Sequence, residues 1–338
     1  MKLKLKIILH DRTFIVFYPL LAIFLFASCS DSPYQSYQLK GSVFGTTFAI
    51  SYQDSVNRDF RISLDSVFSE FNKSLSTYRA DSDISMVNSG DTNIQVDRYF
   101  IEVFELSKVV YNETAGYFDP TVGNLVNAWG FGPKSLGQQI DSSEVFNMLK
   151  TVGFSKVKLL DSRVIKEDQA IFLDFNSIAK GYAVDVVYDF LEGHGIQDFL
   201  IEIGGEIRSK GSNLEGDPWR VGIEQPNFDS SRSVAKVLTL SNKSMATSGN
   251  YRKYKVDKTT GKKYSHTIDP ITGFPSSSKI LSATVVADLS CAQVDAYATA
   301  FMAMGLDRSL SFVSKRQDLG VFLIYLDDQG AIQTHSNL

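Results

Sequence analysis

The residues best suited to chemistry lie on either side of residue 176, where the spacing of the apolar residues changes. The apolar run 171–175 predicts a short buried strand, and from Ile178 apolar residues recur every four positions, as on an amphipathic helix. A strand that leads directly into a helix would place Asp174 beside free backbone N–H groups, a position that favours anions and phosphate above all. Lys180 follows Ser177 by three residues, so both lie on one face near the start of this helix. The alternative is a capped surface helix, with Ser177 as its N-cap and Lys180 in solvent.

A second group of oxygen ligands is expected near the C-terminal end of the chain. Ser290, with a glutamine three residues later, has the capping-box pattern, so a helix is predicted to start there. Asp295 and Thr299 are four residues apart and project from one face of that helix. Together with Ser177 they offer hard oxygen ligands, which suit Mg²⁺ or Ca²⁺. A metal ion, a helix N-terminus and Lys180 that converge would neutralise a diphosphate. For Asp295 and Thr299 alone, an exposed helix face is the alternative.

Aromatic residues and one histidine complete the candidates. A flat ring system could stack on several aromatic side chains, although each singly also fits an ordinary core. These are Phe44, Tyr78, Tyr117, Phe118 and Trp129. His266 stands in a loop turned by Pro and Gly, where it could act as a general base, an orienting group or a simple hydrogen-bond partner.

The elements that must position these residues alternate irregularly between strand and helix. Helices are predicted over 57–72, 99–112, 142–152, 178–190 and from 290 onward, and strands over 41–52, 157–160, 163–166, 199–207, 219–224, 235–240, 281–287 and 320–325. Because no regular βαβ alternation is present, the fold class is expected to be α+β. The sequence shows no internal repeat and no linker within 39–338.

Composition excludes several classes of function. Of 338 residues, 38 are acidic and 34 are Lys or Arg, which gives a net charge of -4 and no basic excess for nucleic acid. Two cysteines and four histidines leave almost nothing from which to build a zinc site. The sequence has no G-x-S-x-G, P-loop or G-x-G-x-x-G motif.

The N-terminus is expected to be separate from the fold. Lysines precede an apolar run that is too short and wrongly flanked for a spanning helix, and Phe26-Ala-Ser-Cys29 resembles the signal of bacterial lipoproteins. Residues 1–28 are therefore predicted to be a signal peptide, Cys29 the lipidated residue of a polar tether over 29–38, and 39–338 the catalytic domain. An ordinary cleaved secretion signal is the alternative. Cys291 is then left as a lone thiol, which is expected to be a buried small hydrophobe.

Read together, eight ordered motifs resemble the FAD:protein FMN transferase family, once described as thiamine-biosynthesis lipoproteins. The resemblance covers about residues 39 to 330. The motifs are Gly41-Ser-Val-Phe-Gly-Thr46, Ser76-Thr-Tyr78, Gly116-Tyr-Phe-Asp-Pro-Thr121, Leu173-Asp-x-x-Ser-Ile-Ala-Lys-Gly-Tyr-Ala-Val-Asp185, Ile203-Gly-Gly205, Ala246-Thr-Ser-Gly-x-Tyr251, His266-x-Ile-Asp-Pro-x-Thr-Gly-x-Pro275 and Asp295-Ala-x-Ala-Thr299.

The resemblance implies a two-lobed α+β domain with an FAD site between the lobes. It also implies Mg²⁺-dependent cleavage of FAD, transfer of FMN through its phosphate to a Thr hydroxyl of a target protein, and release of AMP. Targets in the family are extracytoplasmic flavoprotein subunits, such as those of Na⁺-translocating NADH:quinone reductase and related electron-transport complexes. A lipid anchor would hold this chain on the same, periplasmic, face of a membrane. The inner membrane is the expected membrane.

Site residues carry over position by position. The positions that match flavin-nucleotide contacts are Phe44, Tyr78, Tyr117, Phe118, Asp119, Asp174, Lys180, His266 and Ile268, and those that match the metal site are Ser177, Asp295 and Thr299. By the same resemblance, His266 removes the proton of the acceptor Thr, and Asp174 is the second residue tied to catalysis.

Four positions depart from the family pattern. Phe44 stands where Met is usual, Asn176 where Gly or Ser is usual, Asn250 where Asp is common, and Thr267 where an aliphatic residue is usual. These departures leave the balance between transfer and hydrolysis open. Two alternatives to the transferase therefore stay open: an FAD pyrophosphatase that produces FMN and AMP, and a membrane-tethered flavin-binding lipoprotein without catalysis.

Overall fold

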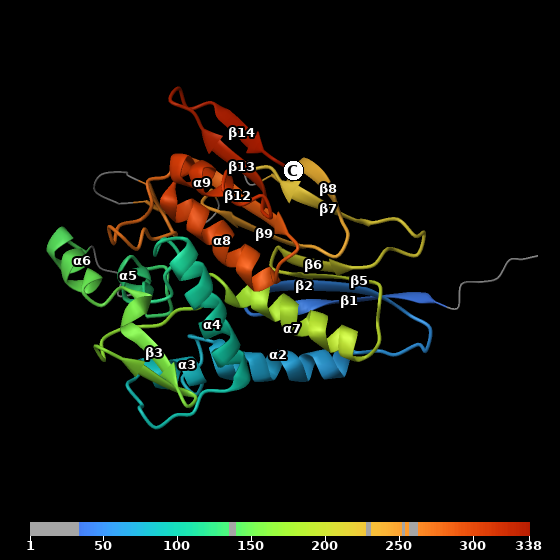
Figure 1. Cartoon of the computed structure of the whole chain (residues 1–338), viewed down its shortest axis with the longest axis horizontal. Helices are drawn as coiled ribbons and strands as arrows, with labels where there is room; N and C mark the ends of the chain where they lie inside the picture. Colours follow the sequence, from blue (N-terminus) through green and yellow to red (C-terminus); the bar gives the residue numbers. More distant parts are fainter. Residues whose placement is uncertain (1–33, 135–139, 228–230, 252–253, 257–262) are drawn as a thin grey trace, which may run out of the picture.

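A large antiparallel sheet, covered by helices on one face, forms the centre of the protein (Figure 1). The computed structural model describes residues 34–134, 140–227, 231–251, 254–256 and 263–338. The predicted signal over 1–28 and Cys29 lie outside these residues. The α+β class is confirmed, because strands and helices are interspersed and the strands of each sheet pair antiparallel. Over the described ranges, no helix combines the length and the apolar character needed to cross a membrane.

The main sheet has eight strands in the order β1-β2-β5-β6-β9-β12-β13-β14. Their bounds are β1 Gln35–Val43, β2 Thr46–Asp54, β5 Phe199–Ile203, β6 Glu206–Lys210, β9 Ser244–Gly249, β12 Ile280–Ala287, β13 Gly320–Leu326 and β14 Ile332–Ser336. Three separate hairpins are β3 Val157–Leu160 with β4 Arg163–Lys166, β7 Trp219–Glu224 with β8 Val234–Leu240, and β10 Tyr254–Val256 with β11 Lys263–Ser265. The helices are α2 Arg61–Leu75, α3 Asp83–Asn88, α4 Arg98–Glu113, α5 Gly123–Ala128, α6 Ser142–Leu149, α7 Ala179–Gly193, α8 Cys291–Met304 and α9 Leu306–Val313.

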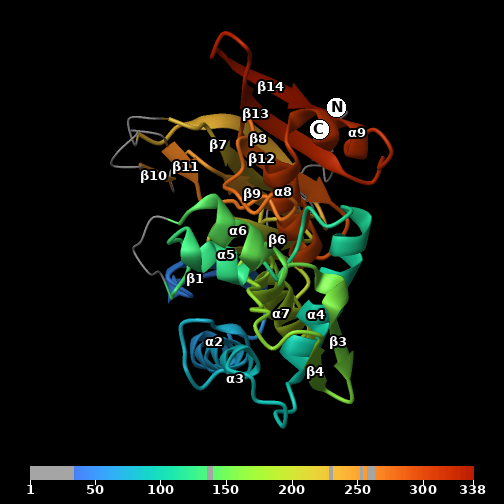
Figure 2. The ribbon, with the colours of Figure 1, turned by 90° about the vertical axis from the view of Figure 1, so that its left-hand side faces the viewer.

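Successive side chains of β6 point to opposite faces of the sheet. Ile207 packs into an apolar cluster with Val221 and Leu240 of the β7–β8 hairpin, which covers one face. Its neighbours Glu206 and Arg208 point to the other face, toward α7. Figures 1 and 2 show α7 and α8 together with α2 and α4 on this second face.

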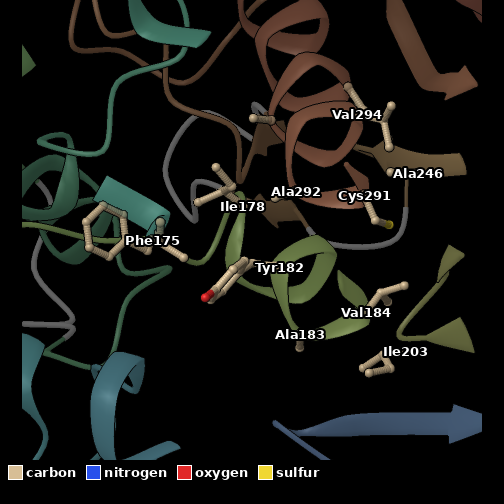
Figure 3. Close-up of a cluster of buried hydrophobic side chains, with 14 of the residues drawn as sticks. Phe175, Ile178, Tyr182, Ala183, Val184, Ile203, Ala246, Cys291, Ala292 and Val294 are labelled. Atoms are coloured by element: carbon tan, nitrogen blue, oxygen red, sulfur yellow. The ribbon is translucent and has the colours of Figure 1, made fainter. Parts of the chain in front are cut away.

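The helices α7 and α8 meet at their N-terminal turns, within the main core. Figure 3 shows Ile178, Cys291 and Ala292 around this meeting point, and all three side chains are completely buried. Cys291 is a free cysteine, as expected for a small buried hydrophobe. Gly181 allows the close approach, because a Cβ there would lie 2.7 Å from the carbonyl carbon of Cys291 and 2.8 Å from Cβ of Asp295.

Three ion pairs, which we call the α7–β6 ion-pair row, join α7 to alternate residues of β6. In order along both elements they are Lys180–Glu206 at 2.6 Å, Asp185–Arg208 at 2.6 Å and Glu192–Lys210 at 2.7 Å. The first two pairs include a buried carboxylate, whereas Glu192 of the third is exposed. Since residues two apart on a strand share a face, the row holds α7 along β6 in one alignment.

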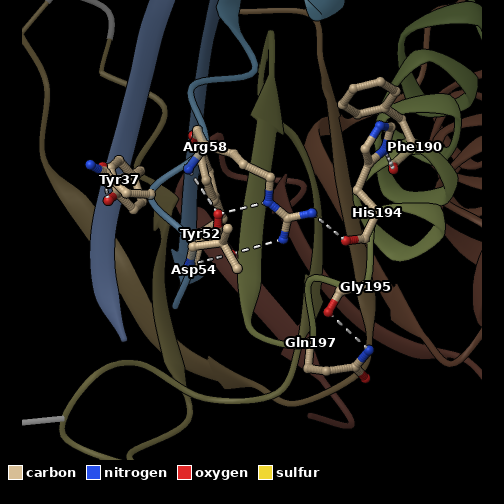
Figure 4. Close-up of polar contacts among 10 residues, drawn as sticks. Tyr37, Tyr52, Asp54, Arg58, Phe190, His194, Gly195 and Gln197 are labelled. Carbon is tan, nitrogen blue, oxygen red and sulfur yellow. Dashed lines mark hydrogen bonds and ion pairs between the residues drawn. The ribbon is translucent and has the colours of Figure 1, made fainter. Parts of the chain in front are cut away.

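A clamp at the other end of α7 joins the helix to β2. Asp54, buried at the end of β2, accepts hydrogen bonds from Nε and Nη2 of Arg58 at 2.9 and 2.8 Å. Arg58 also donates from Nη1 to the carbonyl oxygen of His194, and Tyr52 donates to the carbonyl oxygen of Arg58 (Figure 4). Both ends of α7 are therefore fixed by charged groups.

A smaller apolar cluster supports the loop that carries His266. Leu125 of α5, Val145 of α6 and Ile268 form its buried centre, and Trp129 and Phe274 pack against it. This cluster is separate from the main core that surrounds α7 and α8.

The structure differs from the sequence predictions at several strands. The predicted strand 41–52 turns at Phe44 and Gly45, so it is divided between β1 and β2. Residues 171–175 do not form a strand: Phe172 makes only an isolated bridge to Val122, and the segment is otherwise irregular, although it is buried as its apolar character requires. The sheet begins at Gln35, so the last four residues of the predicted tether, 35–38, pair with β2. In contrast, the helix predicted from Ser290 is confirmed, with the Ser290 side chain accepting the N–H of Gln293.

Candidate active site

Two tight turns and two helix beginnings come together on the helical side of the sheet. The β1–β2 turn at Phe44 and Gly45 lies beside the β5–β6 turn at Gly204, whose N–H donates to the carbonyl oxygen of Thr47. Gly204 has a φ of +66°, and a Cβ there would lie 3.2 Å from Cδ of Lys180. The glycine therefore leaves room for the lysine stem to cross the turn.

A cluster of three charged groups occupies the place where α7, α8 and β6 meet. Glu206 is almost completely buried, and its Oε1 is 2.6 Å from Nζ of Lys180, which keeps 34% of its side chain exposed. Asp295 is buried as well. Burial lowers the pKa of Lys180, but the charges of Asp295 and Glu206 outweigh it, so the net effect raises the pKa and keeps the ammonium charged. Burial raises the pKa of both carboxyl groups, and Lys180 opposes this effect.

The N–H groups at the start of α7 are mostly occupied by the chain itself. Those of Ile178 and Ala179 both donate to the carbonyl oxygen of Phe175, at 3.0 and 2.8 Å. The N–H of Gly181 donates to Oδ2 of Asp295 at 3.0 Å. The prediction of free N–H groups for phosphate is therefore wrong at these three positions. The Lys180 side chain is left as the main positive group at this end of the helix.

The predicted metal ligands come from these same helix beginnings. Ser177 is half-buried directly before the N-cap Ile178, and Asp295 lies against the first turn of α7 through the Gly181 N–H. Thr299, one turn further along α8, is within 3.1 Å of the hydroxyl of Ser248. Within the part of the chain that the structure describes, no group of three or more His, Cys, Asp or Glu side chains is placed to hold a metal ion.

The donor chemistry nevertheless fits a hard cation. One carboxylate with two hydroxyls is an oxygen set of the type that Mg²⁺ accepts, with water and phosphate completing its coordination. Glu206 adds a further observation, because its buried Oε2 has no hydrogen-bond partner among the described residues. A buried carboxylate oxygen without a partner is costly, and a cation nearby would lower that cost.

Asp174 and Tyr78 lie close to each other at the edge of this site. Asp174 is buried, and its Oδ1 accepts the N–H of Asn176 at 2.8 Å, while its own N–H donates to the carbonyl oxygen of Pro120. Burial raises the pKa of Asp174. Partial burial and the charge of Asp174 raise the pKa of Tyr78, whose side chain is still 69% exposed. An exposed aromatic ring beside a buried acid is suited to contact a ligand.

The segment from Tyr117 to Asp119 is held mainly by internal bonds. Phe118 lies in the main core, so its ring is not exposed to a ligand. Both oxygens of Asp119 accept hydrogen bonds, Oδ1 from Thr121 and Oδ2 from the N–H of Phe154, and burial raises its pKa to about 6. Tyr117 is half-buried, and Cζ of Arg308 lies over its ring, 5.4 Å from the ring centroid. Of the three side chains, only that of Tyr117 remains partly accessible.

The loop that carries His266 is tied to both apolar clusters. The ring of His266 lies 6.3 Å from that of Phe131, and Ile268 is buried in the smaller cluster. The Ser276 hydroxyl donates to the carbonyl oxygen of Met302 in α8. Two of the positions that depart from the family pattern meet here, because the Thr267 hydroxyl donates to Oδ1 of Asn250 at 2.9 Å.

A hollow of about 780 Å³ lies next to the β1–β2 turn. Phe44 lines it, with Phe68 and Asn72 of α2 and with Arg79. Of the predicted contact residues, Phe44 alone lines this hollow; its ring packs on those of Phe68 and Phe71. The hollow and the charge cluster share the β1–β2 turn, since Thr46 lines the first and lies against Gly204.

Comparison with known proteins decides the family. The model of the ApbE family matches residues 44–323, which include every predicted site residue except Cys29. The chain belongs to the ApbE family. Its relatives include the FAD:protein FMN transferase of Vibrio cholerae, 36% identical over 318 residues, with 92% of this chain and 93% of the relative covered. That of Haemophilus influenzae is 34% identical, with 88% and 89% covered.

Solved structures of the ApbE family agree with the fold. The flavin transferase ApbE from Vibrio cholerae superposes with a TM-score of 0.79 at 32% identity, covering 90% of this chain and 97% of that one. The flavinyl transferase ApbE of Pseudomonas stutzeri, in its apo form, also gives 0.79, at 31% identity and 90% and 95% coverage.

Sequence reasoning missed Glu206 and assigned no role to Asp185. Glu206 follows the glycine pair of the β5–β6 turn and is the direct partner of Lys180. The signal was an acid that directly follows the two glycines interrupting the predicted strand 199–207, which places it next to a turn. Nothing in the sequence pattern indicated which lysine it would meet.

Proposed function

We propose that this ApbE-family chain is a Mg²⁺-dependent FAD:protein FMN transferase. It would cleave FAD, attach FMN through a phosphoester to a threonine of an acceptor protein, and release AMP. Relatives of that name, similar over nearly the whole chain, support the proposal. The observation that carries it is the charge cluster of Lys180, Glu206 and Asp295 where two helices begin, since a charged ammonium beside oxygen ligands suits a diphosphate.

The proposed reaction needs one new bond and one broken bond. The acceptor hydroxyl forms a P–O bond to the flavin-side phosphorus, and the bond from that phosphorus to the bridging oxygen breaks, so AMP leaves with that oxygen. Lys180 stabilises the negative charge of the phosphates. His266 takes the proton of the threonine hydroxyl as general base. Mg²⁺, held by Ser177, Asp295 and Thr299, would supply further charge neutralisation and orient the phosphates.

The other predicted contacts would bind the flavin nucleotide. Phe44 lines the hollow and Tyr78 is exposed beside Asp174, so both rings are accessible to a flat ligand. Asp174, the second proposed catalytic residue, is buried and close to Tyr78, where it would hold a polar group of the nucleotide. Phe118, Asp119 and Ile268 would contribute through their backbone, because their side chains are buried.

We also propose that the chain acts on the periplasmic side of a membrane, attached through a lipid on Cys29, after removal of residues 1–28. The sequence around Cys29 supports this proposal. The acceptors would be extracytoplasmic flavoprotein subunits, such as those of Na⁺-translocating NADH:quinone reductase or a related electron-transport complex.

The test mixes the chain with FAD, Mg²⁺ and a threonine-containing acceptor domain. We expect a mass increase of one FMN on the acceptor, a fluorescent band on a denaturing gel, and an equal amount of AMP; EDTA should abolish all three. His266→Asn should reduce labelling by about 100-fold or more, within the usual contribution of a general base, while FAD binding persists.

The outcomes separate the alternatives. AMP release without a labelled acceptor would show that the chain is an FAD pyrophosphatase. Tight FAD retention without AMP, even in excess Mg²⁺, would show a flavin-binding protein without catalysis. Either result would overturn the transferase proposal.

A further inference from the structure

Asp185 is a buried acid of α7 that binds groups of two other elements. Its Oδ1 accepts the N–H of Cys291 and its Oδ2 accepts the N–H of Ala292, each at 2.8 Å. Arg208 of β6 donates from Nη1 to Oδ1 at 2.6 Å. The first two N–H groups of α8 thus have their acceptor in a neighbouring helix, in addition to the local cap at Ser290.

The same arrangement occurs in the opposite direction. Asp295 of α8 accepts the N–H of Gly181, in the first turn of α7. Each helix therefore begins at a carboxylate that the other helix supplies, and we call this arrangement the reciprocal cap. A carboxylate at a helix N-terminus interacts favourably with the helix dipole, and these two do so in a buried environment where screening is weak.

The reciprocal cap fixes the two helices against sliding. A shift of α8 by one residue would remove both N–H bonds to Asp185 and would also displace Asp295 from Gly181. The close packing at Gly181, where no Cβ separates the helix from the Cys291 backbone and from Asp295, leaves little freedom for a compensating movement.

Burial of the Asp185 carboxylate costs desolvation free energy that an apolar side chain at the same position would not cost. Desolvation raises its pKa to about 6, against the favourable effects of Arg208 and the two N–H groups. A buried ion pair is often no more stabilising than apolar side chains of similar volume. A role in setting geometry is consistent with keeping a charge there.

We propose that Asp185 is a positioning residue for the cation site: by holding the first turn of α8 on α7, it sets where Asp295 lies relative to Ser177 and Lys180. The inference rests on the proposed cation site of the transferase. Asp185 does not itself contact the substrate or the ion. Its effect is transmitted through the helix that carries Asp295, as partners outside the ligand set often act.

The test measures Mn²⁺ binding to the whole chain by electron paramagnetic resonance, and Mg²⁺ binding by calorimetry, without FAD. Asp185→Asn keeps the shape but replaces one acceptor oxygen with an NH₂ group. We expect it to weaken metal binding by about 10- to 100-fold, as substitutions of supporting residues around metal ligands typically do. If this variant does not fold, Asp185→Asn with Arg208→Gln removes both charges together, and the same weakening is expected.

Two control variants distinguish positioning from general stability. Glu192→Gln breaks the exposed end of the α7–β6 ion-pair row, and Asp54→Asn breaks the clamp at the opposite end of α7. Both should bind metal as the unaltered chain does, even where they unfold more easily. Metal binding by the Asp185 variants equal to that of the unaltered chain would overturn the inference.

The binding measurement also separates this inference from the proposed reaction. If the unaltered chain binds metal and the Asp185 variants bind it weakly, yet no FMN is transferred, the transferase proposal fails and the inference stands. If the unaltered chain binds neither Mn²⁺ nor Mg²⁺, the inference fails.

Discussion

Replacement of Gly181 by alanine tests the contact between α7 and α8 directly. The added Cβ would lie 2.7 Å from the carbonyl carbon of Cys291, whereas ordinary contacts start at 3.4 Å. The carbonyl oxygen of Cys291 would lie nearer still, so the helices would have to separate by about 1 Å, because a backbone atom cannot turn away as a side chain can. The bond from Gly181 to Asp295 would lengthen at the same time.

Opposing effects set the size of the change. Alanine favours a helix over glycine by about 1 kcal/mol. Overpacking costs about 1–3 kcal/mol, and a weakened bond to a buried carboxylate costs about 1–3 kcal/mol more. We therefore expect Gly181→Ala to lower the free energy of unfolding by about 1–5 kcal/mol. A displacement of Asp295 by up to about 1 Å should also weaken catalysis, by up to about 100-fold.

Gly193, the last residue of α7, provides a matched control. A Cβ there meets nothing within 4 Å. Gly193→Ala should therefore leave activity unchanged and change the free energy of unfolding by at most about 1 kcal/mol, in the stabilising direction. Urea unfolding and AMP release from FAD measure both properties. Equal or greater stability of Gly181→Ala relative to the unaltered chain would refute the close contact between the helices.

Two further predictions concern the charged groups at the two ends of α7. Lys180→Met keeps the aliphatic stem but removes the charge, so we expect kcat/KM for AMP release to fall by about 100- to 1000-fold. Lys210→Met, at the far end of the α7–β6 ion-pair row, is the control, and its kcat/KM should stay near that of the unaltered chain. A Lys180→Met variant that keeps more than a tenth of the activity would contradict the role of Lys180 in binding phosphate. Asp54→Asn should lower the free energy of unfolding near pH 7 by about 1.5–3 kcal/mol. Its hydrogen bonds with Arg58 hold the pKa of Asp54 well below its ordinary 3.8, so this stabilisation is present above that pH and is lost as the pH falls below it. The difference between the two proteins in urea unfolding should therefore shrink below pH 4, and a difference that stays constant down to pH 2 would contradict the assignment.

Periodicity and turn chemistry predicted most elements near the site. The strands 157–160 and 163–166 and the helix from Ser290 were located correctly, because alternation and capping are local properties. The apolar run 171–175 was misread as a strand, since a short buried segment has the same composition whether or not it pairs. Burial was predicted there, but pairing depends on neighbours that the run itself does not identify.

The candidate site shows the same limit. Asp295, Ser177 and Lys180 were expected to converge, and the structure places Asp295 and Lys180 at one meeting point of α7 and α8. The occupied N–H of Gly181 could not be predicted, because its acceptor is 114 positions away in the sequence. Glu206 was missed for the same reason, as its partner comes from another element.

The order of charges in the α7–β6 ion-pair row, with one cation followed by two anions on α7 and the reverse on β6, has a consequence for the choice among misaligned states during folding. If α7 docked one step toward the far end of β6, Lys180 would face Arg208, and like charges would meet. One step the other way would bring Asp185 against Glu206, again with like charges, and both of these carboxylates are buried. Each shifted alignment would contain one like-charge pair and one opposite-charge pair in place of three opposite-charge pairs. The charges therefore favour one docking position for a helix whose apolar side alone would tolerate several.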